Sequence, residues 1–192
     1  MIVLGIDTAL DACSVAIVRD LNMLAHLHEP MARGQAERLA PMVQQAAQHA
    51  GVAFDQLDRV AVTTGPGSFT GVRVGLSFAR ALALSIGKAC IGVSTLEALA
   101  LEDGEEGARA AVIETPGASY FALYENGAPL IAPRNIARGE HEALRGEAVL
   151  KGPDVTVNAA ALAVRAGRLH PALYPPNPTY LRAPHVTAPE GA

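Results

Sequence analysis

The sequence contains no tryptophan, and aromatic residues make up only 4% of its 192 positions. Its core must therefore be built from Ala, Val, Leu and Ile, with 18 glycines available for turns and close contacts. The two cysteines, Cys13 and Cys90, could pair on counting alone, but each lies in an apolar run that is typical of a buried free thiol. We therefore expect a reducing, cytoplasmic environment.

A basic stripe is also missing, since the net charge is −4 and the sequence pI is near 5.8. Proteins that bind nucleic acid alone usually carry such a stripe, because neutralising phosphates drives the affinity. Any RNA contact is therefore expected to come through another subunit. No apolar run reaches the roughly 20 residues that span a bilayer, so we expect no membrane contact. The run that begins at Met1 meets an acid at Asp7, which favours a strand over a signal peptide.

Apolar patterning in the first half predicts the order β-β-β-α-β-α-β. Helical spacing begins at Ala36 and stops at Gly51, which predicts the first helix, with Pro41 inside it causing a kink or a late start. The second helix follows a glycine-rich loop and ends at Gly87. Strands are expected at residues 2–8, 13–18, 24–28, 59–63 and 89–93.

The second half repeats this pattern more weakly after an acidic stretch at residues 102–107. Strands are expected at 110–114, 120–124, 129–134 and 147–150, and a helix at 158–169. Two successive units of this kind predict a duplicated α/β fold with two lobes, as in actin, the seventy-kilodalton chaperones and the sugar kinases. We expect one lobe at residues 1–101 and a reduced lobe at 102–192, with a proline-rich, extended tail.

The glycine-rich loop reads Gly-Pro-Gly-Ser-Phe-Thr-Gly at residues 65–71. Glycines before a helix can bring backbone N–H groups to a phosphate. This loop lacks the Gly-Lys-Ser/Thr of a Walker loop, and its spacing differs from Gly-x-Gly-x-x-Gly by one residue. The alternative is structural, with Ser68 or Thr70 capping the helix and the glycines making the turn.

Asp7, with Thr8 beside it, is the second candidate for binding a ligand. In kinases of the two-lobed fold, an acid at the end of the first strand holds the metal of a nucleotide. The following turn here contains no glycine, which makes backbone approach to a phosphate harder. A structural hydrogen-bond acceptor is an equal alternative for Asp7. We assign no confident cofactor site.

The second helix is apolar almost all round, which indicates burial on more than one side. Its expected sheet-facing stripe comprises Gly75, Phe78, Ala79, Leu82 and Ile86. The other side is a candidate partner surface, unless a C-terminal segment covers it. On this side, and on the matching side of the first helix, we expect a partner interface formed by Arg38, Met42, Gln45, His49, Val72, Arg73, Leu76, Arg80, Ala83 and Leu84.

The six histidines do not form a recognisable metal site. His26 and His28 share a strand face, but no third ligand lies near them in the sequence. No Gly-x-Ser-x-Gly elbow and no Cys–His arrangement is present. We therefore expect neither catalytic residues nor a metal.

Several segments resemble the TsaB family, which is also called YeaZ. They are Ile-Asp-Thr and Ala-Cys-Ser within residues 6–14, the run Gly-Pro-Gly-Ser-Phe-Thr-Gly-Val-Arg-Val-Gly at 65–75, and Ile-Gly-Val-Ser-Thr-Leu at 91–96. Leu-Ala-Pro at 39–41 and Tyr-Leu-Arg at 180–182 are similar to further family motifs. The resemblance is close over about residues 1–100 and covers the rest in outline.

The resemblance implies an actin-like fold and a non-enzymatic subunit that pairs with the paralogue TsaD through the first two helices, or forms a homodimer alone. TsaD, with the ATPase TsaE, transfers a threonylcarbamoyl group to the adenosine beside the anticodon of tRNAs that read ANN codons, so tRNA is met only through the complex. TsaD carries a His-x-x-x-His metal motif. At the matching positions this sequence has Thr95 and Leu99, which supply no imidazole.

The sequence departs from the family pattern at two places. The second lobe opens with Glu-Thr-Pro-Gly at residues 114–117 rather than an Asp-Ala-Arg-like segment, and the first helix begins with Gly-Gln-Ala-Glu at 34–37 rather than a His-Ser/Thr-acid triplet. Two enzymatic alternatives stay open: a metallopeptidase-like protein, which requires metal ligands, and a small-molecule kinase, which would use Asp7 as its metal-binding acid.

Overall fold

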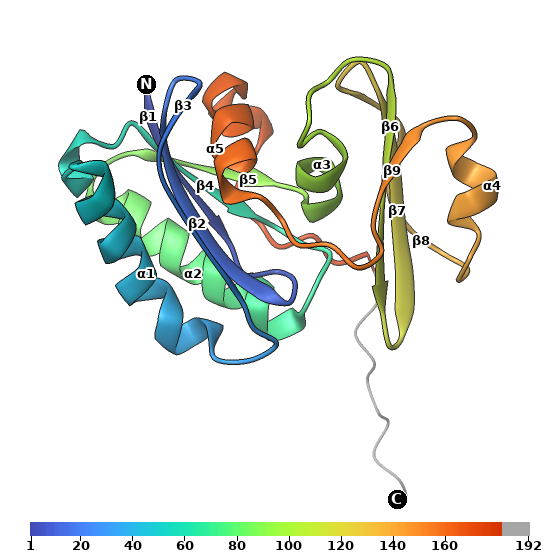
Figure 1. The fold of residues 1–192 in the computed structure, drawn as a ribbon, viewed down its shortest axis with the longest axis horizontal. Helices are drawn as coiled ribbons and strands as arrows, with labels where there is room; N and C mark the ends of the chain where they lie inside the picture. Colours follow the sequence, from blue (N-terminus) through green and yellow to red (C-terminus); the bar gives the residue numbers. More distant parts are fainter. Residues whose placement is uncertain (182–192) are drawn as a thin grey trace, which may run out of the picture.

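Five strands from the first half of the chain form a mixed sheet in the computed structural model, which describes residues 1–181 (Figure 1). The order across the sheet is β3-β2-β1-β4-β5. The hairpin partners β1, β2 and β3 pair antiparallel, and β1, β4 and β5 pair parallel. The strands are β1 (Ile2–Asp7), β2 (Ala12–Arg19), β3 (Asn22–Pro30), β4 (Arg59–Thr63) and β5 (Ala89–Val93).

A second sheet repeats this order with one strand fewer, β8-β7-β6-β9. Again three strands pair antiparallel, and β9 is added parallel to the first strand of the unit. This repetition confirms the predicted duplicated, actin-like fold with a reduced second unit. The strands are β6 (Ala108–Thr115), β7 (Ala118–Glu125), β8 (Ala128–Ile136) and β9 (Val149–Lys151).

The helices form three layers around the two sheets, as Figure 1 shows. Helices α1 (Gln35–Ala50) and α2 (Phe69–Ser85) cover the outer face of the first sheet. Helices α3 (Thr95–Ala100) and α5 (Ala159–Arg168) lie between the sheets. Within residues 1–181, the outer face of the second sheet carries only α4 (His141–Arg145). Two 3-10 turns complete the chain, η1 (Phe54–Gln56) and η2 (Pro171–Leu173).

Three hydrophobic clusters follow from these layers. One lies beneath α1 and α2 and includes Leu4 and Leu39. A second lies between the sheets and joins residues of both, such as Ile91 and Ile113. The third and smallest lies beneath α4, around Phe121. Because the middle cluster belongs to both sheets, the two lobes share a core.

Helix α5 is held against the first sheet, although it comes from the second half of the chain. Its first turn is capped by the Asn158 side chain, which accepts hydrogen bonds from the next N–H groups. Gly5 permits the close approach, because a Cβ there would overlap the carbonyl oxygen of Ala159. At its other end, the Arg59 guanidinium donates to the carbonyl oxygens of Ala166 and Leu169 at 2.9 and 2.6 Å. The boundary expected near residue 101 lies between β5, the last strand of the first sheet, and β6, the first strand of the second sheet. It does not separate the helices in the same way, because α5 follows the boundary but packs on the first sheet.

A buried ion-pair network links the two sheets through the helices between them. Arg165 of α5 contacts the carboxylate of Glu97 on α3 at 2.6 Å, and both side chains are 11% exposed. The same guanidinium reaches Glu105, in the loop before β6, at 2.8 Å. Attraction between such charges is strong where water is excluded, but it has to offset the cost of desolvating both groups.

Most elements match the sequence-based prediction, with two additions. Helix α1 begins at Gln35 and contains Pro41, so a late start of this helix was wrong. The short helices α3 and α4 were not predicted. No helix within residues 1–181 is long and apolar enough to cross a membrane. The final residues of the expected proline-rich tail, 182–192, lie outside the described part of the chain.

Candidate functional site

The glycine-rich loop packs directly against the turn between β1 and β2. A Cβ at Gly67 would overlap the carbonyl oxygen of Ala9, and a Cβ at Gly71 would overlap that of Thr8. One turn later, a Cβ at Gly75 would lie 2.6 Å from the Thr8 hydroxyl oxygen. Gly67 and Gly71 are therefore explained by close packing of backbone on backbone, and Gly75 by packing against the Thr8 side chain, without any ligand.

The start of α2 uses its polar groups within the protein. The N–H of Ser68 donates to the carbonyl oxygen of Ala9 at 2.7 Å. The Ser68 hydroxyl accepts from the N–H of Gly71 at 3.3 Å, which makes Ser68 the helix cap. The capping interpretation of the loop is therefore confirmed for Ser68. These contacts leave fewer free N–H groups for a phosphate than a phosphate-binding loop offers.

Asp7 is completely buried at the end of β1. The Thr63 hydroxyl donates to its Oδ1 at 2.6 Å, and the N–H of Ala9 donates to the same oxygen at 3.2 Å. Its Oδ2 has no hydrogen-bond partner among residues 1–181. Burial raises the pKa of this carboxyl to about 6, although both hydrogen bonds act to lower it. Thr8 beside it is also buried, and its hydroxyl donates to the carbonyl oxygen of Gly71 at 2.7 Å.

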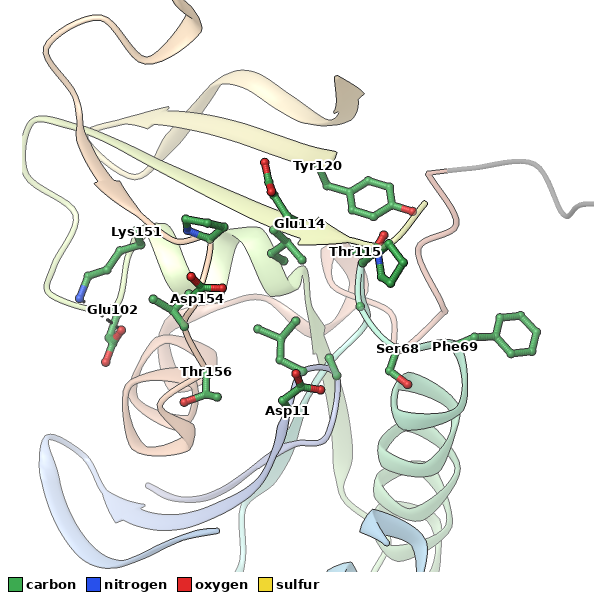
Figure 2. Close-up of a pocket in the computed structure, with 17 residues that line it drawn as sticks. Asp11, Ser68, Phe69, Glu102, Glu114, Thr115, Tyr120, Lys151, Asp154 and Thr156 are labelled. Atoms are coloured by element: carbon green, nitrogen blue, oxygen red, sulfur yellow. Dashed lines mark hydrogen bonds and ion pairs between the residues drawn. The ribbon is translucent and has the colours of Figure 1, made fainter. Parts of the chain in front are cut away.

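A cleft of about 890 Å³ lies between this junction and the second sheet (Figure 2). Its lining carries the carboxylates of Asp11, Glu102, Glu114 and Asp154, and a single lysine, Lys151. The ammonium of Lys151 is already paired with Glu102 at 3.4 Å. An excess of carboxylates repels a phosphate, so the cleft is electrostatically unsuited to a nucleotide.

Asp7 and Thr8 do not line this cleft. The turn residues Ala9, Leu10 and Asp11 stand between them and the open space. The cleft therefore lies between the two sheets without exposing the carboxyl group of Asp7 to its interior.

Helix α2 exposes only part of the predicted partner surface. The expectation that Val72, Leu76 and Ala83 face outward was wrong, because all three are buried in the cluster beneath α1 and α2. The exposed members are Arg73, Arg80 and Leu84.

The predicted sheet-facing stripe of α2 was only partly right. Gly75 and Ala79 are buried as predicted. The large side chains Phe78 and Leu82, however, are only half-buried. Gly71 and Gly75 bring the helix close to the end of β1, so the positions around them become the buried stripe. Small residues decide the contact where two backbones approach closely, and hydrophobicity alone does not reveal this.

Helix α1 shows the same pattern of partial agreement. Met42 is fully buried, so its assignment to the outer surface was wrong. Arg38 and Gln45 are half-buried, since Arg38 donates to Glu29 at 2.7 Å and to Gln45 at 3.3 Å. His49 is exposed near the end of the helix. Whether these positions contact a partner stays a prediction.

An aromatic and cationic cluster at the start of α2 was missed by sequence reasoning. The Arg73 guanidinium lies 3.3 Å above the centre of the Phe69 ring and donates to the Tyr180 hydroxyl at 3.0 Å. Tyr180 belongs to the C-terminal strap (residues 174–181). Two backbone contacts hold this strap: Gly92 N–H to Tyr174 O at 2.9 Å, and Thr179 N–H to Thr64 O at 2.8 Å. All three residues lie in segments that resemble the TsaB family, but no local pattern indicates that they meet.

The position of the strap tests the alternative, left open by the sequence, that a C-terminal segment covers the outer side of α2. It reaches the first turns of this helix through Tyr180 and contacts Arg73 there. Further along, Leu84 is 83% exposed. The described part of the tail therefore contacts the beginning of α2 through Tyr180 but leaves Phe69 and Leu84 exposed.

Helix α3 starts where the resemblance placed the metal ligands of TsaD. Thr95 and Leu99 are both fully buried, and Leu99 belongs to the shared core. His26 contacts the Ser14 hydroxyl at 3.2 Å, and burial lowers the pKa of its imidazole. Within residues 1–181, no group of three or more His, Cys, Asp or Glu side chains could hold a metal ion.

Comparison with known proteins finds relatives among the TsaB and TsaD proteins. The family model described as TsaD, tRNA N6-adenosine threonylcarbamoyltransferase, matches residues 28–120. The tRNA threonylcarbamoyladenosine biosynthesis protein TsaB of Escherichia coli is 40% identical over 129 residues, 65% of this chain and 55% of that protein. TsaB of Haemophilus influenzae is 38% identical over 97 residues, 50% of this chain and 41% of that protein. The chain is therefore similar to TsaB proteins in sequence over half of its length or more.

The likeness extends to the whole fold. A solved Pseudomonas aeruginosa structure, described as similar to peptidase YEAZ, is 26% identical and superposes with a TM-score of 0.76, covering 94% of this chain and 99% of that one. The sequence matches cover less, so the chain spans about half the length of the curated TsaB relatives it matches. The TsaB resemblance seen in the first hundred residues is therefore confirmed, and the fold extends it to the second sheet.

Proposed function

We propose that this chain is a non-catalytic scaffold subunit in the synthesis of threonylcarbamoyladenosine in tRNA. It pairs with the threonylcarbamoyltransferase TsaD, and TsaE acts with the pair. The observation that carries the pairing is the exposed outer face of α2, where Leu84 is 83% and Phe69 is 62% exposed. These two large apolar side chains lie at opposite ends of the same helix face, and exposed apolar side chains together with arginines on one face are typical of a protein contact.

The non-catalytic role is supported by the chemistry of the cleft. Asp7 is shut away from it by the turn at residues 9–11, and the cleft itself carries an excess of carboxylates. The positions that would bear metal-binding histidines hold Thr95 and Leu99, which are both fully buried. A scaffold needs none of these groups, whereas a kinase or a metallopeptidase requires an accessible acid or ligand set.

The proposed mechanism is activation by association. TsaD docks on α1 and α2, burying their exposed side chains, and supplies the metal, the substrate site and most of the tRNA contact. The acceptor is the adenosine beside the anticodon of tRNAs that read ANN codons. The negative net charge of this chain fits an indirect role in RNA binding. Without TsaD, the same face forms a homodimer.

Reconstitution tests this proposal directly. The chain, with TsaD and TsaE from the same organism, is assayed for threonylcarbamoylation of tRNA with each subunit omitted in turn. We expect a stable complex with TsaD, and loss of activity when this chain is left out. Undiminished activity without this chain would contradict the scaffold role. Saturable micromolar binding of ATP and magnesium to the isolated chain, by calorimetry, would support the kinase alternative.

A matched pair of variants tests the surface. Leu84→Glu places a charge on the exposed end of α2, and Leu130→Glu places one on β8, where Leu130 is 62% exposed. Both should leave the fold intact, because neither side chain is buried. We expect only Leu84→Glu to weaken the TsaD complex. Its dissociation constant should rise by about tenfold or more, as when a residue that dominates an interface is lost. Leu76→Glu is unsuitable, since Leu76 is part of the core and its loss would unfold the protein.

A further inference from the structure

One side of α2 carries a continuous row of exposed residues that we call the outer stripe. Its members follow each other at intervals of three or four residues, so they lie on the same side of a helix with 3.6 residues per turn. Each is exposed in the folded chain. The outer stripe consists of Phe69, Arg73, Ser77, Arg80 and Leu84.

The outer stripe is positively charged on a chain whose net charge is −4. Helix α2 contains no Asp or Glu at all. Neither Arg73 nor Arg80 forms an ion pair with a carboxylate within residues 1–181, in contrast to Arg38 and Arg165, which do. Two guanidinium groups therefore stand unneutralised between the exposed apolar ends of the stripe.

One of these arginines is held in position without losing its charge. Arg73 stacks on Phe69 and bonds to the Tyr180 hydroxyl of the C-terminal strap. Both contacts are to neutral groups, so they restrict the side chain but do not neutralise it. A guanidinium fixed in this way loses little conformational entropy when a carboxylate binds to it, and it favours bidentate pairing.

Building on the proposed pairing, we propose that the outer stripe selects a partner whose docking face carries carboxylates opposite Arg73 and Arg80. The occupant is the TsaD-like paralogue, and the contact is an apolar helix packing with two ion pairs that set its register. Charge complementarity of this kind contributes to specificity and to the rate of association.

A second copy of this chain fits the same face less well. It would bring an identical pair of arginines on α2, and its α1 contains a single acid, Glu37. Like charges brought together at an interface are repelled, which disfavours that partner relative to an acidic one. The homodimer should therefore be the weaker of the two assemblies at low ionic strength.

The test measures binding of the wild-type chain and three variants to the TsaD paralogue by calorimetry. Arg80→Gln removes one charge, Arg80→Glu reverses it, and Arg134→Glu makes the same reversal at an exposed site on β8, away from the stripe. We expect Arg80→Gln to weaken binding about threefold and Arg80→Glu at least about tenfold. Arg134→Glu should bind as the wild type does. Equal affinities for the two reversed variants would overturn the proposal.

Ionic strength gives the second readout. Raising the salt concentration from about 0.01 M to about 1 M shortens the Debye length from about 30 Å to about 3 Å. Binding to the paralogue should weaken over this range, while self-association of this chain, followed by sedimentation, should strengthen. The opposite pair of responses would overturn the proposal. A wild-type chain that forms no complex would overturn the scaffold function and this proposal together, whereas a complex insensitive to Arg80→Glu would overturn this proposal alone.

Discussion

The two sheets share one strand order, but they are packed in different ways. The first is covered by long helices on one face and by α5 on the other, with glycines at the closest contacts. The second shares its inner face with the common core, and its outer face is covered by the five-residue α4 over a small cluster. The duplicated unit is therefore complete only in the first half, and the second depends on the first for much of its buried surface.

This difference shows what the glycine-rich loop contributes. In the first unit, Gly67 and Gly71 allow the start of α2 to pack directly against the β1–β2 turn. The described part of the second unit has no comparable loop and helix. Gly67 and Gly71 of the glycine-rich loop are thus explained by tight packing beneath the proposed partner surface on α2.

The largest expected effect is at the tightest contact of the first unit. Gly71→Ala places a methyl group against the backbone carbonyl of Thr8, which cannot move aside as a flexible side chain would. We expect a loss of more than about 3 kcal/mol of unfolding free energy, or failure to fold.

The matched control is Gly167→Ala, also within a helix, whose new methyl group would meet only side-chain atoms at 3.8 Å or beyond. This change should be neutral or stabilising by up to about 1 kcal/mol, because alanine favours helix. Urea unfolding of both variants measures the difference. Similar stabilities would show that the close contact does not constrain the loop.

Breaking the link between the sheets should have the next largest effect. Arg165→Met leaves Glu97 buried with no cation, and we expect a loss of about 3 kcal/mol because an unpaired buried charge is costly. Adding Glu97→Gln should recover part of that loss, since the orphaned charge is then gone. Thermal or urea unfolding provides the comparison, and a double variant less stable than Arg165→Met would contradict this account.

The buried acid of the first unit should make stability depend on pH. Between pH 3.8 and about 6, folded Asp7 retains a proton that the unfolded chain has released. The free energy of unfolding therefore falls as the pH rises through this window, by about 2–3 kcal/mol, and the loss is complete above it.

Asp7→Asn should remove this pH dependence. It keeps an oxygen for Thr63 and Ala9 but leaves its NH2 group without a partner, so we expect a net gain of only about 1 kcal/mol at pH 8. Urea unfolding at pH 4.5 and pH 8 tests it. Asp11→Asn, on the exposed part of the same turn, controls for losing one charge and should leave the wild-type profile in place.

The smallest effect compares the two outer cores directly. Val62 lies beneath α2 and Val112 beneath α4, and both are fully buried. Replacement by alanine should cost about 2 kcal/mol at Val62 and about 1 kcal/mol at Val112, because short α4 and β9 can collapse into the gap more easily. Equal losses in urea unfolding would show that the second sheet is packed as firmly as the first.

The duplicated fold could be predicted from the sequence because its strands and long helices have strong local patterns. The residues of β1 form a short apolar run, which predicts a strand, and the helical spacing of α1 stops at Gly51, which predicts the end of the helix. The helices α3 and α4 escaped prediction, since six and five residues are too few to establish a helical period. The same local reasoning offered Ser68 or Thr70 as the cap of α2, because capping depends on neighbours in the sequence, and the structure shows that Ser68 is the cap.

By itself the sequence determined the order of the strands and long helices along the chain, the resemblance to TsaB and the exposed arginines of α2. Which face of α2 is buried was decided only by the tertiary structure, because Gly71 and Gly75 rotate the contact toward β1 and draw Leu76 into the core. The tertiary structure also brought Tyr180 to Arg73, across 107 positions of the chain. Local patterns specify the elements, whereas close backbone contacts and long-range pairs depend on how those elements pack together.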